Sequence, residues 1–291
     1  MTSFRSRSVL RGVRIVSLAL NLPGPAALLR LRALGARCVK VEPPAGDPMR
    51  HYNPAAHEAL SRAVTVVTLD LKTPTGQAWL HRRLASADVL LTSFRPSALR
   101  KLGLDAATLR QRWPGLSCVE IVGAPGPAAE HPGHDLTYQA EAGLVSGQAL
   151  PPSLLADMAG ALMASEAVLA AVLAQRSTGQ GVHRRVALSD AAHWLAQPLH
   201  WGLTGPGQLL GGAHAGYQVY ACRDGRVALA ALEPHFAAAL GRVVGLAPLT
   251  PQDCLKPAAH QAVQAFMARH TCAELGALAQ AHDLPLLTLP G

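Results

Sequence analysis

Three residues far apart in the chain carry side chains that can move a proton or attack a carbonyl: His134, Asp157 and Glu233. Histidine is the side chain best suited to proton transfer at neutral pH, because its ordinary pKa is about 6.5. A carboxylate in a cleft at the start of a helix can serve as a base or as a nucleophile. An acidic residue beside an imidazole can orient it and stabilise its charge.

Each of these residues also has a purely structural interpretation. Asp157 stands before an apolar helical run, and aspartate is a preferred helix N-cap worth about 1 kcal/mol. A single histidine in a loop, such as His134, is more often a surface or capping residue, although Gly133 would let a ligand approach the backbone closely. Glu233 is held extended by Pro234, so its carboxylate can cap the following helix. Both interpretations stay open at all three positions.

Hydrophobic patterning predicts the elements that must position these residues. In the first 120 residues, short β-branched runs alternate with helical patterns, which is typical of β-α-β units with right-handed crossovers. Strands are expected over 14–18, 39–41, 64–71, 89–92, 117–122 and 185–188, and helices over 26–34, 157–176 and 189–203. The predicted fold class is therefore α/β, with an open, Rossmann-like parallel sheet.

A connector that holds four glycines between 205 and 212 divides the chain into two expected domains. The larger is an α/β domain over 1–204, and the smaller is an α+β domain over 205–291. The second domain opens with a hairpin pattern around a turn at Asp224-Gly225 and continues with two helices, over 234–244 and 257–269. Because the first β-α turn lacks G-x-G-x-x-G, an NAD-dependent dehydrogenase is disfavoured.

Composition restricts the partners. Lys and Arg outnumber Asp and Glu by 26 to 18, which favours an anionic partner. The basic residues form no dense run, so nucleic-acid binding is not expected. The most apolar segment, 158–174, is interrupted by Ser165 and Glu166 and is shorter than a bilayer span. We interpret it as a buried helix and expect no membrane partner.

The five cysteines are odd in number and never paired as C-x-x-C. This pattern argues against a disulfide framework or a zinc knuckle and predicts a reducing, cytoplasmic location. The histidine pairs His131/His134 and His193/His200 lack i,i+4 spacing with a third ligand nearby, so no metal site is expected.

A set of short motifs, all in one order along the chain, resembles the class III CoA-transferase superfamily (CaiB/BaiF type) and most closely its α-methylacyl-CoA racemase branch. The motifs are Ala87-Asp88-Val89-Leu90, Phe94-Arg95-Pro96, Lys101-Leu102-Gly103-Leu104, Gly133-His134-Asp135-Leu136-Thr137-Tyr138, Leu154-Leu155-Ala156-Asp157-Met158-Ala159-Gly160, Thr178-Gly179-Gln180-Gly181, Asp224-Gly225-Arg226 and Leu232-Glu233-Pro234-His235-Phe236. The resemblance covers nearly the whole chain. It implies an interlocked homodimer and an acyl-CoA substrate.

The resemblance also implies the roles of the three residues. In the transferases the aspartate at position 157 is the nucleophile, and in the racemases it is one of two bases. His134 and Asp157 would then face opposite sides of the substrate α-carbon, with Glu233 paired to His134. The first expected function is epimerisation of a 2-methylacyl-CoA through an enolate. The alternatives are CoA transfer to a free carboxylic acid, with Asp157 as nucleophile, and an inactive CoA-binding homologue.

The same resemblance assigns the contacts with coenzyme A, which belongs to the substrate, so that no prosthetic group is expected. Arg95 and Lys101 suit phosphate groups. The small domain is expected to be truncated relative to the family, and Pro43 stands where racemases carry an arginine beside the adenine. The expected CoA-contacting residues are Leu69, Asp70, Leu71, Lys72, Ser93, Phe94, Arg95, Lys101, Gly133, Asp135, Leu136, Thr137 and Tyr138.

Overall fold

The computed structural model describes residues 8–291, which form two compact units. Unit 1 extends to Ala196, and unit 2 is Gln197–Gly291. The division lies ahead of the glycine-containing connector on which the sequence places the boundary.

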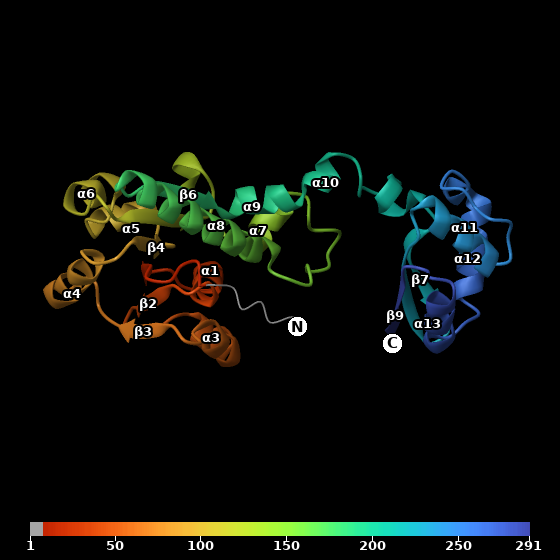
Figure 1. Ribbon diagram of the computed structural model, residues 1–291, viewed down its shortest axis with the longest axis horizontal. Coiled ribbons are helices and arrows are strands. Elements are labelled where there is room, and N and C mark those ends of the chain that lie inside the picture. The colour runs from red at the N-terminus through yellow and green to blue at the C-terminus, as the bar shows by residue number, and fades with distance from the viewer. Residues whose placement is uncertain (1–7) are drawn as a thin grey trace. The chain divides into compact units, whose positions relative to one another are not determined.

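Unit 1 is built on a six-stranded parallel sheet in the order β3-β2-β1-β4-β5-β6, which confirms the predicted open α/β sheet. Figure 1 labels β2, β3, β4 and β6 of this sheet. In this order the chain reverses its direction of travel across the sheet between β1 and β4. Ligands of such sheets bind outside the carboxyl ends of the strands at that switch point. The strands are β1 (Arg14–Ser17), β2 (Arg37–Glu42), β3 (Thr65–Thr68), β4 (Val89–Thr92), β5 (Ser117–Val122) and β6 (His183–Ala187).

The central strands are largely apolar because both faces of the sheet are covered. Val89 and Leu91 of β4 belong to one hydrophobic cluster, whereas Leu90 between them belongs to another. Successive side chains of a strand point to opposite faces, so each cluster is the core on one side of the sheet. The first contains α1 (Pro23–Ala33) and α8 (Leu155–Thr178), and the second contains α4 (Pro74–Leu84), α5 (Pro96–Lys101) and α6 (Ala106–Arg112).

The long helix α8 is the main helix of the first cluster, where it packs on α1. Its 24 residues exceed the expected 157–176 at both ends, and it stops at Gly179, which adopts the left-handed conformation with φ 72°. By length and composition alone, α8 is long and apolar enough to cross a membrane, and half of its most apolar window is buried within the protein.

The remaining elements of unit 1 are short. They are α2 (Met49–Tyr52), α3 (Pro54–Leu60), the 3-10 turn η1 (Gly126–Glu130), α7 (Asp135–Glu141) and α9 (Leu188–Leu195). Several helices of unit 1 begin with Pro in the first turn, where the missing N–H costs nothing. Helix α7 packs on both α8 and α9 and thereby fixes the segment that carries His134.

Unit 2 contains an antiparallel sheet in the order β7-β8-β9 and three helices over one core. The expected hairpin is β7 (Tyr217–Cys222) and β8 (Gly225–Ala230), and the expected helices are α11 (Pro234–Val243) and α12 (Pro257–Met267). The sequence patterns did not reveal α13 (Cys272–Ala281) and β9 (Leu286–Pro290). Unit 2 also includes α10 (Gln197–His200), η2 (Leu209–Ala213) and η3 (Asp253–Leu255).

Candidate active site

A cavity of about 170 Å³ opens at the carboxyl ends of the parallel strands. Its walls come from the segments that follow β1, β4, β5 and β6, together with α7 and α8, so it lies at the switch point of the sheet. The lining residues are Leu20, Asn21, Pro23, Ser93, Phe94, Arg95, Ile121, Val122, Gly123, Ala129, His131, Gly133, His134, Tyr138, Asp157 and Leu188.

His134 and Asp157 both line this cavity, as the convergence predicted from the sequence requires. His134 is the N-cap of α7 and has an extended backbone. The Thr137 hydroxyl accepts a hydrogen bond from the His134 amide at 3.2 Å and donates one to the His134 carbonyl at 2.7 Å. These bonds fix the backbone of His134, an exposed residue in the lining of the cavity.

Asp157 is the third residue of α8, not its N-cap, so the capping interpretation is wrong. The N-cap is Leu154, which makes no side-chain capping bond. Oδ1 of Asp135 instead accepts a hydrogen bond from the Asp157 amide at 2.9 Å. The first amide groups of a helix have no hydrogen-bond partner within the helix. Asp135, which lies outside α8, supplies that partner for the Asp157 amide. Within residues 8–291 the Asp157 carboxyl group itself has no hydrogen-bond partner.

The surroundings of Asp157 make it a weak acid. Burial is the larger cause, and the negative charge of Asp135 adds to it, so that the pKa of Asp157 rises from 3.8 to about 7. Asp135 is only 4% exposed, and its second oxygen accepts a hydrogen bond from the Gln139 side-chain amide. At neutral pH Asp157 is therefore divided between its acidic and basic forms, as proton transfer in both directions requires.

Tyr138 closes one side of the cavity against two glycines. A Cβ atom at Gly123 or Gly133 would lie 2.2 Å or 2.4 Å from the Tyr138 hydroxyl oxygen. Gly133 therefore makes room for the Tyr138 side chain. The sequence had suggested instead that this glycine makes room for a ligand. Burial, with the Asp157 charge, raises the pKa of Tyr138, so its hydroxyl stays protonated.

The residues expected to contact CoA fall into two groups. Ser93, Phe94, Arg95, Gly133 and Tyr138 line the cavity. The others lie outside its lining: Leu69, Asp70, Leu71 and Lys72 after β3, the exposed Lys101 at the end of α5, and Asp135, Leu136 and Thr137 in the first turn of α7.

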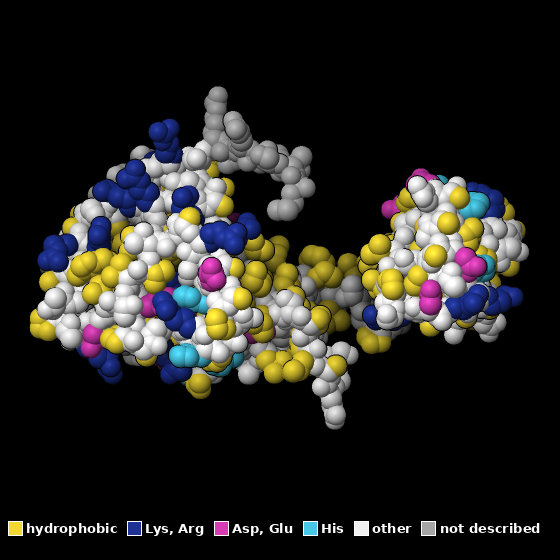
Figure 2. Space-filling view, turned by 90° about the horizontal axis from the view of Figure 1, so that it is seen from below, with side chains coloured by type: hydrophobic (Ala, Val, Ile, Leu, Met, Phe, Trp, Pro, Cys, Tyr) yellow, Lys and Arg dark blue, Asp and Glu magenta, His cyan; other side chains and the backbone are white. Residues whose placement is uncertain are grey.

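Basic side chains suit a long anionic substrate. Arg95 is exposed as the N-cap of α5, and the Ser93 hydroxyl accepts a hydrogen bond from the Leu20 amide at 3.1 Å. Lys and Arg side chains are spread over the visible face of unit 1, with few Asp or Glu among them (Figure 2).

Glu233 belongs to unit 2. It is extended as the N-cap of α11, with Pro234 as the first helical residue, and its side chain makes no capping hydrogen bond. Its pairing with His134 stays a prediction.

Sequence reasoning missed a buried group of charges that holds one wall of the cavity. Lys40 is 2% exposed and forms ion pairs with Glu42 and Asp47, which are fully buried. The other oxygen of Asp47 accepts a hydrogen bond from the Asn21 amide at 3.0 Å. Asn21 lines the cavity with φ 63°, a left-handed conformation that Asn tolerates. The available signal was the presence of Lys40 and Glu42 within the apolar part of strand β2.

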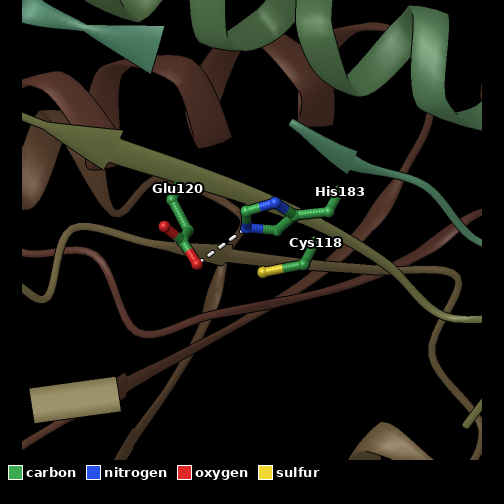
Figure 3. A group of neighbouring side chains, drawn as sticks. All are labelled: Cys118, Glu120 and His183. Carbon is green, nitrogen blue, oxygen red and sulfur yellow. Dashed lines mark hydrogen bonds and ion pairs between the residues drawn. The ribbon is translucent and has the colours of Figure 1, made fainter. Parts of the chain in front are cut away.

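A second missed group lies on β5 and β6. The Cys118, Glu120 and His183 side chains point toward one another on one face of the sheet (Figure 3). Glu120 bonds to His183 at 2.8 Å and accepts two hydrogen bonds from Arg185. Burial opposes ionisation of Glu120, but the hydrogen bonds from His183 and Arg185 outweigh it and lower the pKa of Glu120. This group is an ion-pair cluster whose carboxylate Arg185 already neutralises.

CoA-transferase family III matches residues 10–289, nearly the whole chain. The chain belongs to this family. Membership confirms the resemblance found in the sequence and places the cavity in a family of enzymes that includes both CoA-transferases and α-methylacyl-CoA racemases.

The relatives of this family III chain carry two kinds of name. A cinnamoyl-CoA:phenyllactate CoA-transferase of Clostridium sporogenes is 34% identical over 62% of this chain and 49% of its own length. The α-methylacyl-CoA racemase of Mus musculus is 33% identical over 82% of this chain and 65% of its own length. The chain thus spans about half to two thirds of these relatives.

Solved structures agree with the fold. The crystal structure of a hypothetical protein from Mycobacterium tuberculosis covers 95% of this chain at 29% identity and a TM-score of 0.82, and this chain matches 84% of that one. A CaiB/BaiF family protein from Brucella suis gives a TM-score of 0.78 at 25% identity, over 97% of this chain and 84% of that one.

Proposed function

We propose that this family III chain epimerises a 2-methylacyl-CoA by two-base proton transfer. The observation that carries the proposal is the common cavity of His134 and Asp157, an imidazole and a carboxyl group whose pKa burial raises to about 7. Two α-methylacyl-CoA racemases among the relatives support it.

The reaction needs one base and one acid on opposite sides of the α-carbon. The basic form of His134 or Asp157 takes the α-proton, and the electron pair of the C–H bond passes into the thioester as an enolate. The acidic form of the other residue then returns a proton to the opposite face. Because the pKa of Asp157 is about 7, the cost of holding it in either form at neutral pH is small.

We assign the substrate's anionic end to the basic residues at the carboxyl edge of the sheet. Arg95 in the cavity and Lys101 at the end of α5 contact phosphate groups, and the segment from Leu69 to Lys72 contacts the nucleotide. Coenzyme A enters as part of the substrate, and no prosthetic group takes part. We further propose that the protein acts in a reducing cytoplasm as a homodimer in which Glu233 orients His134, without nucleic-acid or membrane partners.

CoA transfer is a second candidate, because within residues 8–291 the Asp157 carboxyl group accepts no hydrogen bond and several relatives are named CoA-transferases. The Asp157 carboxylate would attack the thioester and release CoA thiolate, which leaves a mixed anhydride between Asp157 and the acyl group. CoA would attack the anhydride at the Asp157 carbonyl, release the first acid and form an aspartyl thioester. The second acid would attack that thioester and expel CoA thiolate, and the thiolate would attack the acyl carbonyl of the new anhydride to give the second acyl-CoA and free Asp157. This route gives His134 no step, so we place it second.

Exchange of the substrate's α-hydrogen with solvent deuterium distinguishes epimerisation from CoA transfer. With a chiral 2-methylacyl-CoA in deuterated water, we expect deuterium at the α-carbon and loss of optical purity. His134→Ala should abolish exchange and leave CoA binding nearly unchanged, whereas the matched control His131→Ala, in the lining of the same cavity, should exchange. An absence of exchange, together with trapping of an Asp157 acyl adduct by hydroxylamine, would reject epimerisation in favour of transfer.

A further inference from the structure

Two cysteines and an aspartate converge in unit 2. Cys222 is the last residue of β7, Asp224 lies in the turn before β8, and Cys272 is the first residue of α13. Their sulfur and oxygen atoms all lie within 4.8 Å of one another. No close Cys-x-x-Cys spacing reveals this group in the sequence, because the two thiols are 50 residues apart.

The spacing of these atoms fits a tetrahedral metal site. Two sulfurs bound to one tetrahedral zinc ion are about 3.8 Å apart, and a bound sulfur and carboxylate oxygen are about 3.5 Å apart. In unit 2 the two thiols form a hydrogen bond with their sulfurs 3.5 Å apart, and the Cys222 thiol donates to Oδ1 of Asp224 at 3.7 Å. A bound cation would take the place of the thiol protons in these contacts. The sulfur separation is far from the disulfide length of about 2.05 Å and close to that of two ligands on one ion.

The backbone holds the three ligands in place. Oδ1 of Asp224 accepts a hydrogen bond from the Cys272 amide at 2.6 Å, and the Arg223 amide donates to the His270 carbonyl at 2.9 Å. A Cβ atom at Gly225 would lie 3.0 Å from the Cys272 sulfur, so the glycine preserves the space beside that sulfur.

Charge and exposure also suit a cation. Across the part of the chain that the structure describes, Asp224 has no ion-pair partner and its Oδ2 has no hydrogen bond. Cys272 is buried, whereas Cys222 is partly exposed and Asp224 is exposed, which leaves one side open to water as a fourth ligand. Thiolates favour zinc among the abundant divalent ions.

The cluster in Figure 3 lacks these properties, although it also contains three ligand types. Its carboxylate is bonded to Arg185, and His183 Nε2 lies 2.8 Å from Glu120 Oε1. Two such atoms on a tetrahedral zinc ion are about 3.3 Å apart. A cation there would have to displace an arginine from the carboxylate, so this cluster serves as the internal control.

We infer that Cys222, Asp224 and Cys272 bind one zinc ion, with water as the fourth ligand, and so link the β7–β8 hairpin tip to the start of α13. Binding converts two thiols to thiolates, and two protons leave as the ion enters. This inference is independent of the proposed reaction, because all three ligands lie in unit 2 and none is assigned a catalytic step.

The test uses the full chain, reduced with a phosphine and titrated with zinc chloride against a chromophoric chelator. We expect one equivalent of zinc per chain, and calorimetry in two buffers of different ionisation enthalpy should count about two protons released. Cobalt substitution should give the intense visible bands of a tetrahedral site with a thiolate charge-transfer band. Cys222→Ser and Cys272→Ser should each weaken binding at least tenfold, whereas Cys118→Ser should bind as the parent does.

Alkylation keeps the test decisive if a serine variant fails to fold. In the parent chain, zinc should protect Cys222 and Cys272 from iodoacetamide, as read by mass spectrometry. Absence of binding by the reduced chain would overturn the inference, as would binding that survives both serine substitutions or depends on Cys118. A Cys222–Cys272 disulfide formed in air, with no zinc bound after reduction, would assign the pair to redox chemistry instead.

Discussion

Replacing Asp157 with asparagine should stabilise unit 1 at alkaline pH while abolishing the proposed activity. The folded protein raises the pKa of Asp157 from 3.8 to about 7, so folding opposes the ionised form. The whole difference corresponds to at most about 4 kcal/mol. Because the carboxyl group is only partly buried and faces an open cavity, solvent screening reduces this to about 1–2 kcal/mol. An asparagine side chain has nearly the same shape as the aspartate and no charge to desolvate.

The sign of the effect depends on pH. A raised folded-state pKa means that the stability contributed by the protonated group is fully present below pH 3.8 and is lost as the pH rises through 7. The parent chain therefore loses this contribution across that window, and Asp157→Asn does not. The free energy of unfolding of the variant, minus that of the parent, should be near zero at pH 4 and about 1–2 kcal/mol at pH 8.

Urea unfolding followed by circular dichroism at pH 4, 6 and 8 measures this difference. Asp190→Asn is the matched control, since Asp190 is an exposed aspartate in the first turn of α9. If Asp157→Asn gave the same difference at pH 4 as at pH 8, burial of an ionisable carboxyl group at this position would be refuted.

Three further changes test the remaining parts of the site. Asp135→Asn removes the nearby charge but keeps an oxygen to accept the hydrogen bond of the Asp157 amide. The acid limb of the pH–rate profile of deuterium exchange should therefore move down by about one pH unit. An unmoved limb would exclude the Asp135 charge as a cause of the raised Asp157 pKa. Gly123→Ala places a Cβ 2.2 Å from the Tyr138 hydroxyl and should cost about 1–3 kcal/mol in urea unfolding, partly recovered by adding Tyr138→Phe; no cost would contradict the close contact. Arg95→Ala should raise KM for acyl-CoA about tenfold with kcat nearly unchanged, and a fall in kcat alone would reassign Arg95 to the chemical step.

Local patterns predicted most of the fold. The apolar β4 and β5, covered on both faces, could be recognised from composition, and Pro234 marks a helix start correctly. Strand β9 was missed because it has no pattern of its own and exists through its pairing with β8. Helix α13 was missed although a capping box, in which Thr271 and Glu274 bond to each other's backbone amides, marks its start.

The sequence by itself determined which residues can do chemistry: an imidazole at His134, a carboxyl group at Asp157, basic residues for an anionic substrate, and a parallel sheet to carry them. Only the tertiary structure decided that the first two share one cavity and that burial, with the charge of Asp135, raises the pKa of Asp157. It also decided that two cysteines 50 residues apart meet beside Asp224. The physical reason is that side-chain type and local periodicity belong to neighbouring residues, whereas burial, charge proximity and ligand geometry arise where distant segments pack together.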